Sequence, residues 1–382
     1  MAIFTKNEIE RRMRNLRSSL DNAECGIAVS FHNSYYLSGV PIPPWGRYAI
    51  TIVPVDDSPA IVVPAFDKER VAEHSPITDI RTYTDQEKPS LDAAIDLTAD
   101  FVKERKLQKI GIELGSITVL GMELLKKRLP NAQFTDMTDT VDSMRLVSSN
   151  EELELIRKAS EIADIGMETF AAESRVGKPE LSIVDQAISC MNEAIASRYP
   201  QMESDVRCST QQGMRSFQAH GSSVGEKLRS GQILESVIEV SLWHYQASVE
   251  RGMMIGAPTA KQRQALETMI EAHDKAVEAV RPGVKFSEID RISRSVFLRA
   301  GFTRVDAGTG LIRGITSPWY GRIDKGNIRR YNDSILVPNM VMTVEPCALV
   351  SGVGNPRHCD MVLVTKDGHE VLSKARGGMI QL

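Results

Sequence analysis

Apolar positions in the first 150 residues follow two different periods. Continuous apolar runs at Gly26–Ser30, Ala49–Val53 and Ala60–Val63 predict buried strands, whereas the spacing over 7–22 and Ala93–Arg105 predicts amphipathic helices. Further along, the same patterns predict a strand at Ile110–Ile112 and helices at Leu120–Leu129 and Met137–Leu146. Because the strand and helix patterns alternate, they predict a small α/β domain.

A helix start marks the end of this first domain. Ser149 can cap a helix and Glu152, three residues later, can complete a capping box ahead of periodic apolar positions. We therefore expect an N-terminal domain over residues 1–147 and a C-terminal domain over 148–382.

The second domain repeats one arrangement of elements. Helical patterns cover 150–174, 181–197, 259–280 and 287–300, and strand patterns include Ile233–Leu242 and Val341–Val344. Each pair of helices leads into strands, which predicts an internally duplicated α+β unit.

Composition narrows the function only by exclusion. The 382 residues are 42% apolar and 25% charged with a formal net charge of −4, so nothing indicates a nucleic acid or membrane partner. The charged N-terminal segment and the lack of an eighteen-residue apolar run predict a cytoplasmic protein. Five scattered cysteines predict neither disulfides nor a thiolate zinc site: Cys25, Cys190, Cys208, Cys347 and Cys359.

Two glutamates stand in strand-like segments among apolar residues. Glu250 lies in the return strand of a predicted hairpin, where a buried carboxylate needs a partner, and adjacent Arg251 could form a salt bridge with it. Glu345 lies near the end of a separate predicted strand, just before Pro346. Because side chains alternate along a strand, Glu345 shares one face with Thr343. Two strand carboxylates could share a cation, either a metal ion or an organic substrate.

At these residues the chain resembles the pita-bread enzymes, which include methionine aminopeptidase, Xaa-Pro peptidases, ectoine hydrolase and creatinase. The resemblance spans nearly the whole chain, from FTKNEIERRMRNLRSSL through SFHNSYYLSG to the TVEP strand and RHCDMVLVTKDG. It implies a small N-terminal α/β domain followed by a C-terminal pita-bread domain with pseudo-twofold duplication.

The peptidase branch of this family binds two metal ions through two Asp, one His and two Glu. The matching positions here hold Val237, Ser248, Leu311, Glu345 and Cys359. Only one of the five ligand types is kept, and hard divalent ions need several converging ligands. The resemblance therefore implies no metal and no cofactor.

The creatinase branch departs from the metal pattern in the same way. Its general-base histidine matches His220, eleven residues before Gly231. Its hairpin glutamate matches Glu250, which precedes Arg251, and its second glutamate matches Glu345 in VEP. The resemblance thus implies His220, Glu250 and Glu345 as catalytic residues.

The same branch implies a set of substrate-binding residues. Its two carboxylate-binding arginines lie in aromatic-Gly-Arg tripeptides, which match Trp45-Gly46-Arg47 and Tyr320-Gly321-Arg322. A pocket tyrosine falls on Gln246 beside Tyr245, and a pocket histidine falls on Cys359 beside His358. The implied binding residues are Trp45, Arg47, Arg322, Tyr245, Gln246, His358 and Cys359.

These residues imply metal-independent hydrolysis of a small guanidino or amidino acid, most directly creatine to sarcosine and urea. His220 would deprotonate the attacking water, and Glu250 and Glu345 would hold the cation. The resemblance also implies a homodimer whose active site is shared between subunits. Two alternatives stay open: a hydrolase of another zwitterion such as ectoine, and a non-catalytic binding module of the same fold.

Overall fold

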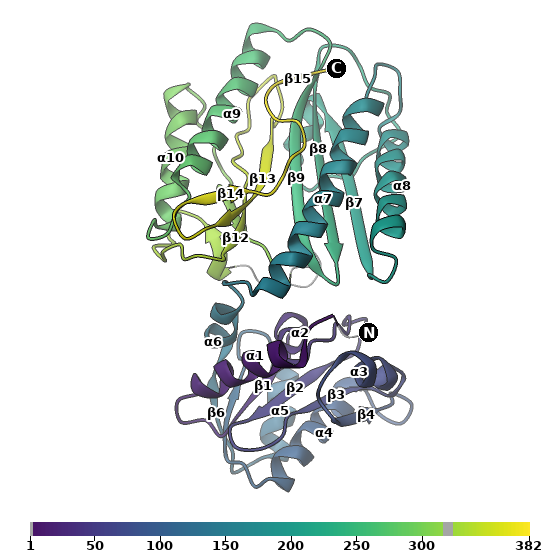
Figure 1. Ribbon diagram of the computed structural model, residues 1–382, viewed down its shortest axis with the longest axis vertical. Coiled ribbons are helices and arrows are strands. Elements are labelled where there is room, and N and C mark those ends of the chain that lie inside the picture. The colour runs from purple at the N-terminus through teal and green to yellow at the C-terminus, as the bar shows by residue number, and fades with distance from the viewer. Residues whose placement is uncertain (1–2, 316–323) are drawn as a thin grey trace. The chain divides into compact units, whose positions relative to one another are not determined.

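The computed structural model describes residues 3–315 and 324–382 and separates into two units (Figure 1). The N-terminal unit ends at Arg145 and the C-terminal unit begins at Leu146. The sequence patterns placed this boundary between residues 147 and 148.

A six-stranded sheet with the order β4-β3-β2-β1-β5-β6 forms the centre of the N-terminal unit. β1 pairs antiparallel with β2 and parallel with β5, so the sheet is mixed. Its strands are β1 (Cys25–Ala28), β2 (Ile50–Pro54), β3 (Ala60–Pro64), β4 (Asp79–Tyr83), β5 (Lys109–Ile112) and β6 (Gln133–Asp136). Its helices are α1 (Lys6–Ser18), α2 (Phe31–Ser38), α3 (Lys68–His74), α4 (Ser90–Glu104), α5 (Val119–Arg128) and α6 (Thr138–Met144).

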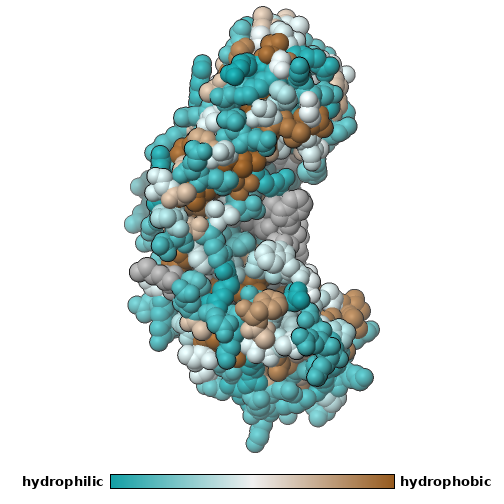
Figure 2. Space-filling model, turned by 90° about the vertical axis from the view of Figure 1, so that its right-hand side faces the viewer, coloured by the Kyte–Doolittle hydropathy of each residue, from teal (hydrophilic) through white to brown (hydrophobic). Residues whose placement is uncertain are grey.

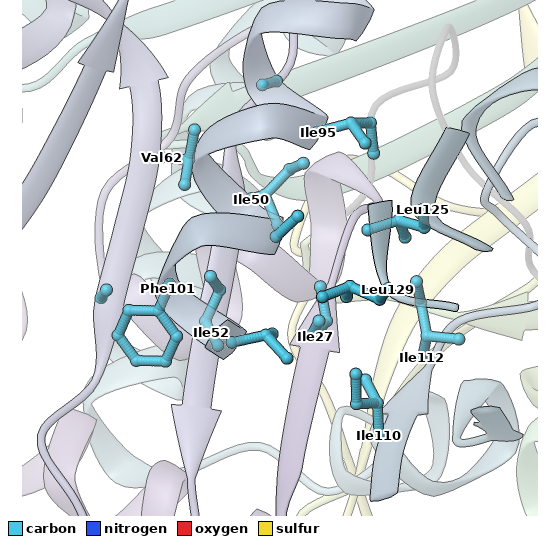
Figure 3. Packing of buried hydrophobic residues seen from close by; sticks show 14 of the residues in the cluster. Ile27, Ile50, Ile52, Val62, Ile95, Phe101, Ile110, Ile112, Leu125 and Leu129 are labelled. Carbon is cyan, nitrogen blue, oxygen red and sulfur yellow. The ribbon is translucent and has the colours of Figure 1, made fainter. Parts of the chain in front are cut away.

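The main core of this unit lies between the sheet and helices α4 and α5 (Figure 3). Branched residues of the strands meet large apolar residues of the two helices. The labelled members are Ile27, Ile50, Ile52, Val62, Ile110 and Ile112 from strands, and Ile95, Phe101, Leu125 and Leu129 from the α4 and α5 segments. This α/β arrangement agrees with the alternating strand and helix patterns of the sequence.

The C-terminal unit contains, in its described part, a nine-stranded sheet whose main path is β11-β10-β12-β13-β9-β8-β7, with β14 paired to β13 and β15 to β9. The strands are β7 (Ser204–Gln212), β8 (Gln232–Leu242), β9 (Tyr245–Ile255), β10 (Gly310–Ile312), β11 (Asn327–Ile328), β12 (Val341–Val344), β13 (His358–Val364), β14 (His369–Val371) and β15 (Ile380–Gln381). The helices are α7 (Asn150–Glu173), α8 (Glu180–Arg198), α9 (Ala260–Ala279) and α10 (Phe286–Arg299).

Two helix pairs cover this sheet, and each pair leads into its own strands. α7 packs on β8, β9 and α8, whereas α9 packs on β12, β13 and α10 (Figure 1). α7 and α8 precede β7 to β9, and α9 and α10 precede β10 to β13. This confirms the predicted pita-bread fold with its internal duplication.

Capping explains where α7 begins. The Ser149 hydroxyl accepts from the backbone N–H of Glu152 at 3.3 Å, and the Glu152 carboxylate accepts from the Ser149 N–H at 2.8 Å. This reciprocal capping box satisfies two N–H groups that the helix leaves without partners.

Sequence patterns missed several elements. α2 is buried on all sides, so its eight residues show no amphipathic stripe. β6 lies at a sheet edge and is largely exposed, so it lacks an apolar run. β7 carries polar residues through most of its length, because one of its long edges is not paired with a further strand of the sheet.

The face of the molecule shown in Figure 2 is mainly hydrophilic, and its apolar residues occur in scattered groups. In the described residues, no helix is both long enough and apolar enough to cross a membrane.

Replacing Phe101 with alanine should destabilise the N-terminal unit. The ring is fully buried and also lies under the guanidinium of Arg105 at 3.7 Å, so the change leaves a cavity and removes a cation–π contact. We expect Phe101→Ala to lower the free energy of unfolding by about 3–5 kcal/mol. Urea unfolding followed by circular dichroism measures this, with hydrogen exchange assigning the loss to β1 to β5. Phe66→Ala is the control, because Phe66 is 66% exposed and should change stability much less.

Candidate active site

Four glutamates gather on one face of the C-terminal sheet, which we call the carboxylate face: Glu235, Glu239, Glu250 and Glu345. Glu235 and Glu239 are four residues apart on β8, so their side chains lie on the same face of the sheet. Glu250 on β9 pairs with Val237, which lies between them on β8. Glu345 directly follows β12. α7 lies on the other side of the sheet, since the Ser236 hydroxyl donates to the sulfur of Met167 at 3.3 Å.

Arg357 joins two of these carboxylates. Its Nε lies 2.9 Å from Glu235 Oε1, and its Nη1 donates to Glu250 Oε1 at 2.9 Å. Arg251, the expected partner of Glu250, lies on the opposite face and pairs with Asp360 at 2.7 Å. A salt bridge to Glu250 was correctly foreseen as one possibility, but its partner was not.

Burial makes two of the glutamates weak acids. It raises the pKa of Glu235 to about 8, and nearby Glu250 adds to the rise while Arg357 opposes it. It raises the pKa of Glu250 to about 7, where Arg357 again opposes burial and Glu345 adds repulsion. Both carboxyls therefore carry a proton for part of the time near neutral pH.

Glu345 is held less tightly than its neighbours. Its side chain is 20% exposed, and its Oε2 lies 3.8 Å from Arg313 Nη2 and accepts weakly from the Cys359 thiol at 3.6 Å. Arg313 is itself buried, and its Nη1 donates to Gln246 Oε1 at 2.7 Å. Burial, with repulsion from Glu345 and Glu250, raises the pKa of Cys359 well above its usual range.

The predicted base, His220, lies in an exposed segment after the short helix Gly213–Phe217. This segment reaches the carboxylate face through its backbone, since Arg357 Nη2 donates to the Ala219 carbonyl at 3.5 Å. The role of His220 as a base stays a prediction.

Two predicted binding residues do not belong to the carboxylate face. Tyr245 is fully buried, and its hydroxyl donates to Glu152 at 2.8 Å on the side covered by α7. His358 lies one residue from Cys359 in β13, so its side chain points away from Glu345 and toward Asp360. Both side chains therefore lie on the face opposite Glu345, because adjacent strand residues face opposite sides, and their role in binding substrate stays a prediction.

Two other predicted residues lie in the N-terminal unit. Trp45 and Arg47 belong to the N-terminal unit, where Trp45 is 75% exposed. Arg47 lines a cavity of about 160 Å³ there and pairs with Asp85 at 2.8 Å. Arg322 lies outside the described residues.

Sequence reasoning missed Arg313 and Arg357, although a signal for each was present. Arg313 stands two residues after Leu311, and Arg357 stands two residues before Cys359. Strand residues two apart share a face. Arg313 could therefore have been placed on the same face as Leu311, and Arg357 on the same face as Cys359.

The fold and the carboxylate face place the chain in the pita-bread class, and comparison with known proteins gives the family. Metallopeptidase family M24 matches residues 154–366, which is more than half of the chain, and the Creatinase/Prolidase N-terminal domain matches residues 12–147. The chain therefore belongs to metallopeptidase family M24.

Individual relatives match along almost the whole chain. An Xaa-Pro dipeptidase of Pyrococcus horikoshii is 27% identical over 352 residues, covering 91% of this chain and 92% of the relative. One from Pyrococcus furiosus is 27% identical over 348 residues, covering 90% and 91%. The crystal structure of an Xaa-Pro dipeptidase from Bacillus anthracis has a TM-score of 0.84 at 21% identity, covering 98% of this chain and 100% of that one.

These comparisons overturn the predicted activity. The family is one of peptidases and the relatives are named for dipeptides, so hydrolysis of creatine, or of another guanidino or amidino compound such as ectoine, is wrong. A non-catalytic module is likewise not what the comparisons indicate. The prediction of a metal-independent enzyme also conflicts with a metallopeptidase family.

The family name implies metal ions, yet the residues at the expected position do not fit a two-metal centre. Val237 and Leu311 carry only alkyl groups, and a thiol with a raised pKa is a poor ligand at Cys359. In the described part of the chain, the one group of three ligand-type residues whose atoms converge lies on the opposite face of the sheet.

Raised pKa values on the carboxylate face should make the protein less stable as the pH rises. Between about pH 5 and pH 8 the folded chain holds protons on Glu235 and Glu250 that the unfolded chain, with pKa values near 4.5, has released. These two groups therefore lower the free energy of unfolding as the pH rises over this range. Glu235→Gln cannot ionise, so its stability relative to wild type should rise by about 1 kcal/mol or more from pH 5 to pH 8.

Urea titrations at several pH values measure this difference. Glu370→Gln is the matched control, because Arg157 lowers the pKa of Glu370 and the carboxylate is ionised in both states over this range. A Glu235→Gln curve parallel to that of wild type would contradict the raised pKa.

Proposed function

We propose that the carboxylate face hydrolyses a small peptide-like substrate that has a free amino group. The observation that carries this proposal is Glu345, a partly exposed carboxylate whose partners among the described residues are a thiol and a guanidinium 3.8 Å away. An ammonium group is the ligand that such a carboxylate favours, through a charge-assisted hydrogen bond. Dipeptides carry this group, and relatives that match nine tenths of the chain are named Xaa-Pro dipeptidases.

Arg313 is suited to the carbonyl next to that amino group. Its guanidinium is buried and oriented by Gln246, and its Nε has no hydrogen-bond partner in the described part of the structure. The Nη2 atom of Arg313 lies 3.8 Å from Glu345 Oε2. This distance is close to the separation between the amino nitrogen and the carbonyl oxygen of one amino acid. A preorganised donor there would stabilise the negative charge that develops on this oxygen during attack.

Glu250 is our candidate for proton transfer. With a pKa of about 7 it can take a proton from the attacking water and return it to the departing nitrogen as the peptide C–N bond breaks. His220 is the second candidate, because its segment contacts Arg357, which binds Glu250. Variants of each residue distinguish the two.

The small-molecule substrate is part of this proposal, and so is a homodimer with a shared site. Arg47 lines a small cavity in the N-terminal unit. It is the residue to test for a contribution to the active site of the partner subunit. Mixing Arg47→Ala chains with Glu345→Gln chains should restore part of the activity if the sites are shared.

Dipeptides with a free amino group should be cleaved, and their N-acetylated forms should not. A panel of Xaa-Pro and other dipeptides, each with its N-acetyl form, tests this by following amino acid release with added divalent metal or with chelator. Glu345→Gln should lower kcat/KM by about 10- to 100-fold, mainly through KM, because a charge-assisted bond is worth about 1.5–3 kcal/mol. Glu370→Gln, an exposed glutamate paired with Arg157, should behave as wild type.

Proton transfer is tested on the same substrates. Glu250→Gln should lower kcat by about 100-fold or more and remove the step near pH 7 from the pH profile. If only His220→Ala does so, the base is His220. Equal cleavage of free and acetylated dipeptides would reject the binding of an amino group at Glu345.

A further inference from the structure

Three ligand-type side chains converge on the helix-covered side of the C-terminal sheet: His273 from α9, and His358 and Asp360 from β13. All three are more than nine tenths buried. His273 Nε2 lies 3.3 Å from Asp360 Oδ2, and His358 Nε2 lies 3.7 Å from the same oxygen. The two imidazole rings are 4.4 Å apart at their centroids. We call these residues the His–His–Asp cluster.

Neighbouring groups orient the cluster as they do in metal sites. His273 Nδ1 lies 3.0 Å from Asp274 Oδ1, so a proton on Nδ1 leaves the Nε2 lone pair directed toward Asp360. Asp360 Oδ1 accepts from Arg251 Nη2 at 2.7 Å, which leaves Oδ2 for the two histidines. Within the described residues, His273 Nε2 is buried without a hydrogen-bond partner.

The distances are close to those that a metal ion requires. Ligands about 2.0–2.1 Å from a tetrahedral zinc are about 3.4 Å from each other. The two nitrogen-to-oxygen distances of 3.3 and 3.7 Å bracket that value, and all three ligand atoms lie within 4.8 Å of one another. Two imidazoles and one carboxylate suit zinc better than magnesium or calcium, which prefer oxygen ligands.

We propose that His273, His358 and Asp360 bind one divalent transition-metal ion, with Zn²⁺ the best match, and that water completes the coordination. The ion would tie α9 to β13 on the side of the sheet opposite the carboxylate face. It is therefore separate from the proposed hydrolytic site, and neither proposal depends on the other.

A metal-free arrangement of the same residues is the competing account. His273 could be an imidazolium that pairs with Asp274 and Asp360, because burial lowers its pKa but the two nearby aspartates raise it by more. In that state the cluster has no place for a second cation. The two accounts therefore differ in whether the folded protein takes up metal.

Metal content of the full-length, tag-free protein tests the proposal. After removal of metal and titration with Zn²⁺, mass spectrometry should find about one ion per chain, and Co²⁺ should give the visible absorption of a four-coordinate site. His273→Ala and His358→Ala should each lose stoichiometric uptake. Asp274→Asn should weaken Zn²⁺ binding by about 10- to 100-fold, because it removes only the group that orients His273.

Matched controls separate this site from the rest of the chain. His369→Ala removes a histidine that contacts a backbone carbonyl instead of the cluster, and Glu345→Gln combined with Cys359→Ser removes two neighbouring donors on the carboxylate face. Both should keep one ion. If the alanine variants fail to fold, His273→Asn and His358→Asn replace them, and X-ray absorption of the Co²⁺ protein counts the imidazole ligands.

Two results would overturn the proposal. The first is that folded wild-type protein takes up no stoichiometric Zn²⁺ or Co²⁺, which would leave the charged-histidine account. The second is that the ion is lost in the Glu345→Gln, Cys359→Ser variant and kept in the histidine variants, which would place it on the carboxylate face.

Discussion

The guanidinium of Arg251 joins three segments of the C-terminal unit. Buried almost completely, it donates to the carbonyls of Glu250 and Cys359, to the Ala375 carbonyl near the C-terminus, and to Asp360 Oδ1. A buried charge is tolerated only when its hydrogen bonds are made so completely. These bonds fix β9 against β13, and every side chain that the two strands direct to either face depends on that pairing.

The two faces of this sheet carry different chemistry because of that pairing. One face carries four glutamates together with Arg313 and Arg357. Burial raises the pKa of two of these glutamates, Glu235 and Glu250. The other collects two histidines and an aspartate beneath α9. The family's metal position falls on the first face, where this chain has alkyl groups at Val237 and Leu311. The residues that converge as ligands lie on the second.

Local signals in the sequence were sufficient for the start of the second domain and for its long helices. The capping box at Ser149 and the long periodic helices depend on neighbours within a few residues, so they could be predicted without knowing any distant contact. Glu250 and Glu345 were also found, because a charge inside an apolar strand is conspicuous. The partner of Glu250 could not be found in this way, since Arg357 becomes its neighbour only through the pairing of β9 with β13.

The differences between the predicted site and the structure also have a physical origin. Tyr245 and His358 were accepted because each stands beside a matching position, but a shift of one residue in a strand reverses the face. The choice of creatine rested on short matches around single residues and on the missing metal ligands. Neither observation describes the substrate, and relatives aligned over nine tenths of the chain are named Xaa-Pro dipeptidases.

The start of β13 and the residue before it supply side chains to both faces within four consecutive positions, 357 to 360. Arg357 and Cys359 point one way, and His358 and Asp360 the other. A substitution here alters one face, but the insertion or deletion of a single residue would exchange both sets together. Point substitutions in this segment can therefore alter either face separately, whereas a change in its length alters both faces at once.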